Sequence, residues 1–86
     1  MNISIDISMY PLREDFESII IAFIKRLRNS PFEMEENGLS TQIHGPYSEV
    51  MDFLKDNMHE ALLDRKNCVF VLKIVNGDHL GHEPTY

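Results

Sequence analysis

Apolar and polar residues alternate strictly at the start of the chain. Apolar side chains occupy positions 3, 5, 7 and 9, and polar residues or Tyr10 stand between and after them. Successive side chains of a strand point to opposite faces, so this pattern predicts a half-buried strand over residues 2–10. Pro11 is expected to end that strand, because proline has no N–H group to donate to a ladder.

Two later stretches have the period of about 3.6 residues that is typical of an amphipathic helix. The first helix is expected to begin after Asp15 and to end before Asn29, and the second to begin near Pro46 or Tyr47 and to end around residues 64–67. Pro46 would suit the first helical position, where its missing N–H group is not needed. The expected buried stripes are Phe16, Ile19, Ile20, Phe23, Ile24 and Leu27 in the first helix, and Val50, Leu54, Met58, Ala61 and Leu62 in the second.

The middle of the chain predicts a hairpin. A short alternating stretch over residues 32–35 leads into Asn37-Gly38, the dipeptide typical of a two-residue type I′ turn, in which both central residues need φ > 0. Residues 39–44 then alternate again, which places Leu39 and Thr41 on the mostly apolar face of a returning strand.

A last strand is expected over residues 68–75, a β-branched stretch in which only Lys73 is charged. Both faces of this strand are apolar, so the face with Val69, Val71 and Val75 is a candidate subunit interface. Residues 79–86 have no periodicity and are expected to form a mobile tail, which leaves residues 1–78 as a single domain.

The predicted order is β-α-β-β-α-β. Right-handed crossovers leave a gap between the first two strands, and the third strand fills it. The sequence therefore predicts an α+β fold, a ferredoxin-like βαββαβ sandwich with a four-stranded antiparallel sheet and two helices on one face.

Composition and charge exclude several classes of protein. The chain has 86 residues, 43% of them hydrophobic, which suits one small globular domain. The net charge of −6 argues against a nucleic-acid partner, because phosphates demand a basic surface. The longest apolar run, residues 19–24, is far shorter than the roughly 20 residues that span a bilayer, so no membrane association is expected. No signal peptide is expected either, and the cytoplasm is the expected location.

Polar residues converge where the first predicted strand ends and the third begins. Thr41 is of particular interest, because a hydroxyl on a core-facing position needs a partner, either a backbone carbonyl or a ligand. The alternative is that these residues are ordinary strand-end and turn residues. The candidate ligand-binding residues are Ser8, Tyr10, Asn37, Leu39, Ser40 and Thr41.

No pattern in the sequence predicts catalysis, a cofactor or a metal site. His79 and His82 have an H-x-x-H spacing, but no third ligand lies nearby in the sequence. Cys68 opens an apolar strand without a paired histidine, so we expect it to be a small buried hydrophobic residue. The acidic residues at positions 33, 35 and 36 are expected to form a solvated edge of the hairpin.

Three segments together resemble the thiamine-binding, YkoF-like family. They are the strand end Met9-Tyr10-Pro11-Leu12, the passage from Ser40 through Gly45 and Tyr47 to Met51, and the closing Val71–Ile74. The resemblance extends from Ile3 to Asn76. It implies the ferredoxin-like fold, assembly into homodimers or homotetramers through the sheets, and binding of thiamine or its hydroxymethylpyrimidine half without chemistry on it.

The favoured hypothesis is therefore a cytoplasmic homo-oligomer that binds thiamine or hydroxymethylpyrimidine, without catalysis, in vitamin transport, salvage or sensing. The candidate serine, threonine and asparagine side chains would supply polar contacts, and Met9, Tyr10 and Leu39 an apolar wall. One alternative is a ligand-free oligomeric protein-interaction module. Another is a small enzyme or an amino-acid-sensing module on the same fold.

Overall fold

The structure, a computed structural model, describes residues 1–12, 14–64 and 67–77. The order of its elements confirms the predicted β-α-β-β-α-β arrangement. The elements are β1 (Asn2–Pro11), α1 (Phe16–Arg28), β2 (Glu33–Glu36), β3 (Thr41–Pro46), α2 (Tyr47–Asp64) and β4 (Cys68–Asn76). The predicted tail, residues 79–86, lies outside the described residues.

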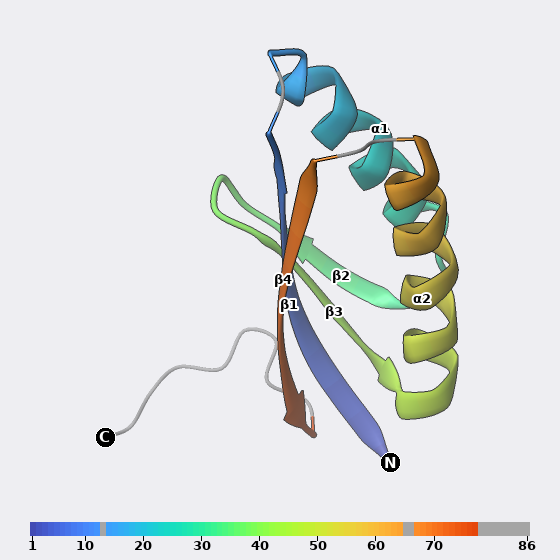
Figure 1. Cartoon of the computed structure of the whole chain (residues 1–86). Helices are drawn as coiled ribbons and strands as arrows, with labels where there is room; N and C mark the ends of the chain where they lie inside the picture. Colours follow the sequence, from blue (N-terminus) through green and yellow to red (C-terminus); the bar gives the residue numbers. More distant parts are fainter. Residues whose placement is uncertain (13, 65–66, 78–86) are drawn as a thin grey trace.

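The four strands form one antiparallel sheet in the order β2-β3-β1-β4. The third strand therefore lies between the second and the first, as predicted. Both helices lie on the same side of the sheet and leave its other face without a helix (Figure 1). This is the ferredoxin-like α+β fold. No helix in the described part of the chain is long and apolar enough to cross a membrane.

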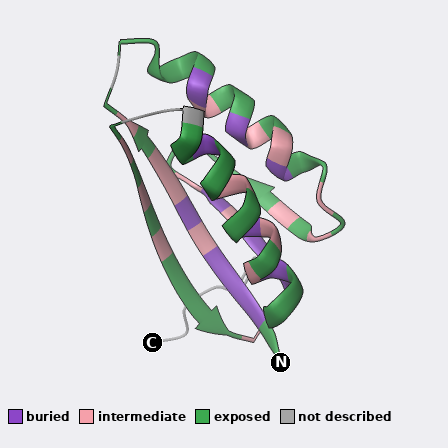
Figure 2. Cartoon of the chain, turned by 45° about the vertical axis from the view of Figure 1, so that its right-hand side comes forward, coloured by how far each residue is buried: buried purple, intermediate pink, exposed green. Residues whose placement is uncertain are grey.

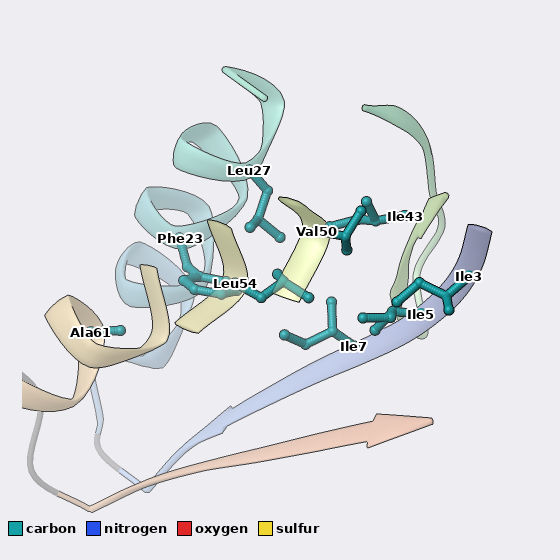
Figure 3. Packing of buried hydrophobic residues seen from close by; sticks show 9 residues of the cluster. All are labelled: Ile3, Ile5, Ile7, Phe23, Leu27, Ile43, Val50, Leu54 and Ala61. Atoms are coloured by element: carbon teal, nitrogen blue, oxygen red, sulfur yellow. The ribbon is translucent and has the colours of Figure 1, made fainter. Parts of the chain in front are cut away.

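The core lies between the sheet and the two helices (Figure 3). Ile5 of β1 is paired with Ile43 of β3, and both side chains are completely buried, as is Leu54 of α2. Figure 2 shows the buried residues along β1 and on the inner sides of the helices. The structure thus confirms the burial that the alternation at the start of the chain and the helical periods predict.

The hairpin loop differs from the predicted type I′ turn. It has four residues, 37–40, and neither Asn37 nor Gly38 has a positive φ. The physical reason is that the Asn37 side chain takes over the turn: its Oδ1 atom accepts hydrogen bonds from the N–H groups of Leu39 (2.8 Å) and Ser40 (3.1 Å). The prediction that Leu39 lies on a strand face is therefore wrong, and β3 begins at Thr41.

Three smaller predictions are also corrected. Pro46 is the last residue of β3, and α2 begins at Tyr47. Leu62 is 48% exposed, because its neighbour Ala61 continues the buried row of α2. The face of β4 opposite Val69, Val71 and Val75 is expected to pack on the core, but Ile74 on that face is 49% exposed, because α1 packs on β1 and α2 on β3 and this end of the edge strand is left uncovered.

Candidate functional site

The two halves of β1 differ in their neighbours. Residues 2–7, the paired half, lie between β3 and β4, whereas residues 8–11, the open half, pair with β4 alone. The reason is that β3 begins at Thr41, opposite Ile7. The N–H and C=O groups of alternate residues point to opposite edges of a strand. Main-chain polar groups of the open half therefore face a gap beside the hairpin loop.

A pocket of about 440 Å³ occupies this gap. Its walls are the chain from Ile7 to Leu12, one side of α1, and the hairpin loop followed by Thr41. The volume lies within the range of small-molecule sites, roughly 300–1,000 Å³. None of the described residues that line the pocket is charged.

Helix α1 contributes two neighbouring apolar rows, each with a spacing of four residues. Ile19, Phe23 and Leu27 form the first row and are buried, and two of them, Phe23 and Leu27, also line the pocket. The second row is less buried and lines the pocket; it consists of Phe16, Ile20 and Ile24. The sequence predicted all six as one core stripe. In the sequence, only the width of that stripe indicates that one of its rows lines a pocket.

Hydrogen bonds fix the polar atoms around the hairpin loop. The Ser40 hydroxyl donates to the Asp6 carboxylate on the neighbouring strand. The Ser8 hydroxyl donates to the Leu39 carbonyl over 3.4 Å. These two contacts hold the loop against β1, and the two bonds accepted by the Asn37 side chain fix the conformation of the loop itself. The polar atoms therefore have defined donor and acceptor roles.

Large apolar side chains surround the mouth of the pocket. Leu39 is 89% exposed, Leu12 66%, Tyr10 51% and Phe16 47%, and all four line the pocket. An exposed apolar group of this kind, drawn from three separate segments, is typical of a surface that another molecule covers.

The structure brings together all six candidate ligand-binding residues. Ser8 and Tyr10 lie on the open half of β1, and Asn37, Leu39 and Ser40 in the hairpin loop. Thr41 is 5% exposed and borders the pocket at the start of β3. The candidate residues did not include the side of α1 that lines the pocket.

The acidic residues of the hairpin do not all lie free in solvent. Glu36 forms a bidentate ion pair with Arg28, with distances of 2.7 Å from Nη2 and 2.8 Å from Nε. The hydrogen bond from Arg28 holds the pKa of the Glu36 carboxyl below its ordinary value. Glu33 and Glu35 are exposed, as predicted. The pair ties the end of α1 to the strand that enters the hairpin loop.

Cys68 is not among the residues that line the pocket. Cys68 is half-buried at the start of β4, and burial raises the pKa of its thiol, which disfavours the reactive thiolate. Residues 1–12, 14–64 and 67–77 contain no group of three metal-ligating side chains. His79 and His82 lie outside the described residues.

Comparison with known proteins connects this geometry to a family. A family model described as "Thiamine-binding protein" matches residues 5–79. A Thermotoga maritima protein provisionally described as a thiamine biosynthesis/salvage protein has a similar structure, with a TM-score of 0.80 and 21% identity over 99% of this chain and 91% of that one. A Streptococcus pneumoniae protein gives a TM-score of 0.84 and 25% identity over 95% and 93% of the two chains.

A third similar structure is a domain of unknown function from Bacillus cereus, with a TM-score of 0.75 and 18% identity over 90% of this chain and 77% of that one. No curated protein matches this chain in sequence. The structural similarities support the fold, and the family match includes every segment that lines the pocket. The chain belongs to the thiamine-binding protein family.

Proposed function

We propose that the pocket binds thiamine or its hydroxymethylpyrimidine half and performs no chemistry on it. The observation that carries this proposal is the apolar pocket with exposed hydrophobic residues at its mouth, in a chain of the thiamine-binding protein family. A cavity of this size, apolar with a few polar groups, suits a molecule as small as one or two heterocycles.

Thiamine fits the pocket chemically. Its flat aminopyrimidine needs an apolar wall and hydrogen-bonding partners, which the second row of α1 and the polar residues of the loop would supply. Its thiazolium ring is a permanent cation, which an aromatic face attracts. Tyr10 and Phe16 lie at the mouth of the pocket, and the net charge of −6 favours the approach of a cation.

A binding role suits these residues better than a catalytic one. The polar side chains at the pocket are hydroxyls and one amide, which orient a ligand by hydrogen bonds. We therefore propose a role in vitamin transport, salvage or sensing. Salvage is one of the two roles in the description of the Thermotoga maritima protein, which names biosynthesis/salvage. The cytoplasmic location stays a prediction.

Isothermal titration of the protein with thiamine, and then with hydroxymethylpyrimidine, tests this function. We expect saturating heat and a dissociation constant in the micromolar range or tighter. Ile20→Ala removes apolar surface from the pocket and should weaken binding, whereas Ile21→Ala, on the exposed side of the same helix, should not. Absence of binding by either compound to the folded protein would contradict the proposal.

The helix-free face of the sheet supports a further part of the proposal, which is self-association. Val69, Val71 and Val75 of β4 are 42–45% exposed there. We propose that a second copy of the chain covers this face, in a homodimer or homotetramer. The same face would serve a partner protein if the chain were a ligand-free interaction module.

Light scattering coupled to gel filtration tests self-association. We expect the wild-type chain to form an oligomer that Val71→Lys dissociates, because a charge would be buried at the interface. Leu63→Lys, on the exposed side of α2, is the matched control and should leave the oligomer intact. A wild-type monomer at high concentration would contradict the proposal.

A further inference from the structure

We propose that the ligand of the pocket takes the place of a missing strand partner and binds the main chain of Met9. The ligand accepts a hydrogen bond from the Met9 N–H group and donates one to the Met9 carbonyl. The inference rests on the proposed function, because it concerns how the same pocket recognises an aminopyrimidine ring.

Hydrogen bonds just beyond the two ladders show which edge of β1 each residue faces. The Leu12 N–H group donates to the Asn67 carbonyl on the side of β4 (2.7 Å). The Met1 carbonyl accepts from the Tyr47 N–H group on the side of β3 (2.9 Å). Main-chain groups of alternate residues point to opposite edges of a strand, so even-numbered residues of β1 face β4 and odd-numbered residues face β3. The N–H and C=O groups of Met9 therefore point away from β4.

The strand partner of Met9 is missing. The register of β1 and β3 would place Leu39 opposite Met9, but the pairing ends at Ile7 and Thr41. The Leu39 N–H group donates to the Asn37 side chain over 2.8 Å, so it is turned away from the Met9 carbonyl. Among the described residues, no main-chain hydrogen bond joins Met9 to the hairpin loop. Met9 thus presents one donor and one acceptor at this edge.

The pocket lies where a longer β3 would continue. The Leu39 carbonyl accepts a hydrogen bond from Ser8, whose side chain lies on the helix-free face because the preceding residue, Ile7, is buried in the core. The loop is therefore displaced toward that face, and Figure 1 shows it bending away from the helices. Helix α1 packs on β1 from the other face. A ligand held between the loop and α1 meets the edge of the strand at Met9.

Pro11 supports this assignment of the edge. It is the next odd-numbered residue of β1, and proline has no N–H group to donate. Proline is found in strands where its missing N–H group costs no ladder hydrogen bond. Its presence in β1 agrees with an edge that has no neighbouring strand beyond Ile7.

An aminopyrimidine complements this pair of main-chain groups. Its exocyclic amino group donates hydrogen bonds, and the ring nitrogen beside it accepts one. The surrounding side chains of α1 are apolar, so a ligand that covered Met9 without matching both groups would leave buried polar groups without partners. The edge at Met9 therefore favours flat rings that carry a donor next to an acceptor.

A pair of variants at one position tests the contact. Met9→Pro and Met9→Ala both remove the methionine side chain, but only Met9→Pro removes the N–H group, and it breaks no bond to β4. We expect folded Met9→Pro to bind thiamine roughly 3- to 10-fold more weakly than Met9→Ala in calorimetric titrations, which is the value of one hydrogen bond.

Amide hydrogen exchange of the wild-type protein, followed by NMR, keeps the test valid if Met9→Pro fails to fold. Saturating thiamine should slow the exchange of the Met9 amide by about tenfold or more, because a hydrogen-bonded amide exchanges only when the bond opens. The Tyr10 amide faces β4 and is the matched control, which should be protected with and without thiamine.

Equal thiamine affinities of folded Met9→Pro and Met9→Ala would overturn the inference and leave thiamine binding intact. An unchanged exchange rate of the Met9 amide in the thiamine-saturated protein would do the same. Absence of thiamine binding by the wild-type protein would overturn the proposed function, and the inference with it.

Discussion

The paired half and the open half of β1 have nearly the same local sequence pattern and very different surroundings. In the paired half, Ile3, Ile5 and Ile7 are 0–3% exposed and lie between two strands and beneath two helices. In the open half, the strand has one neighbour, and the residues beside it line a pocket with exposed apolar side chains at its mouth.

The difference arises from where β3 begins. Because the hairpin loop occupies four residues, β3 starts at Thr41 and stops short of the open half. One continuous strand thus contributes to a packed core at one end and to the wall of a pocket at the other. Stability and the proposed ligand binding should therefore depend on separate parts of the same strand, and substitutions should separate them.

The largest expected effect is in the paired half. Ile5→Ala removes a completely buried side chain and should lower the free energy of unfolding by about 2–5 kcal/mol, because it leaves a cavity. Leu39→Ala, at the mouth of the pocket, should change it by no more than about 0.5 kcal/mol. Urea denaturation followed by circular dichroism measures both. Similar losses of unfolding free energy in the two variants would contradict the difference between the paired half and the pocket.

Two glycines give the second comparison. A Cβ atom on Gly45 would lie 2.9 Å from Phe32 and from Val50, so Gly45→Ala should cost about 1–3 kcal/mol through overpacking. A Cβ atom on Gly38, in the hairpin loop, would meet nothing within 4 Å, and its φ is not positive. Gly38→Ala should therefore leave the melting temperature almost unchanged. A large loss in Gly38→Ala would instead favour the type I′ turn.

The paired half was predictable from the sequence because one physical rule governs it. Alternation at positions 3, 5 and 7 and the helical row that includes Phe23 and Leu27 all demand burial on one face, and nothing competes with that demand. The sheet order followed from the handedness of crossovers. Because β1 and β3 are antiparallel, the end of β1 lies beside the hairpin loop, and this is how the sequence predicts where the candidate residues meet.

The open half was harder to predict because two physical solutions compete there. Asn37-Gly38 suits a turn with positive φ, but the Asn37 side chain also closes a longer loop by accepting two N–H groups. The helical period likewise places the apolar residues Phe16, Ile20 and Ile24 on the inner side of α1. It does not show whether the core or a pocket covers them. The conformation of the loop and the covering of this row of α1 both depend on contacts between residues distant in sequence.

Thr41 lies at the boundary between the two halves and should affect binding more than stability. Thr41→Val replaces its hydroxyl by a methyl group at a buried position beside the pocket. We expect thiamine affinity to fall roughly 3- to 10-fold, the value of one hydrogen bond, and the free energy of unfolding to change by less than about 1 kcal/mol. Unchanged affinity by titration calorimetry would exclude the hydroxyl from the site.

The smallest expected effect is a pH dependence at the exposed ion pair of Arg28 and Glu36. Because the pKa of Glu36 is lowered in the folded protein, the stability from this pair is present above the ordinary value of 4.5 and is lost as the pH falls through the lower value. The difference in unfolding free energy between wild type and Glu36→Gln should therefore shrink in acid. A difference that stays constant from pH 7 to pH 3 would contradict this account.

The most direct test of the central claim is an NMR titration of the ¹⁵N-labelled protein with thiamine. The account predicts saturating shifts of the amide signals of residues 8–12 and 37–41 and of the pocket-facing side of α1, with small shifts in the paired half. Shifts confined to other surfaces, or no shifts in the folded protein, would contradict the assignment of the open end of β1 as the ligand site.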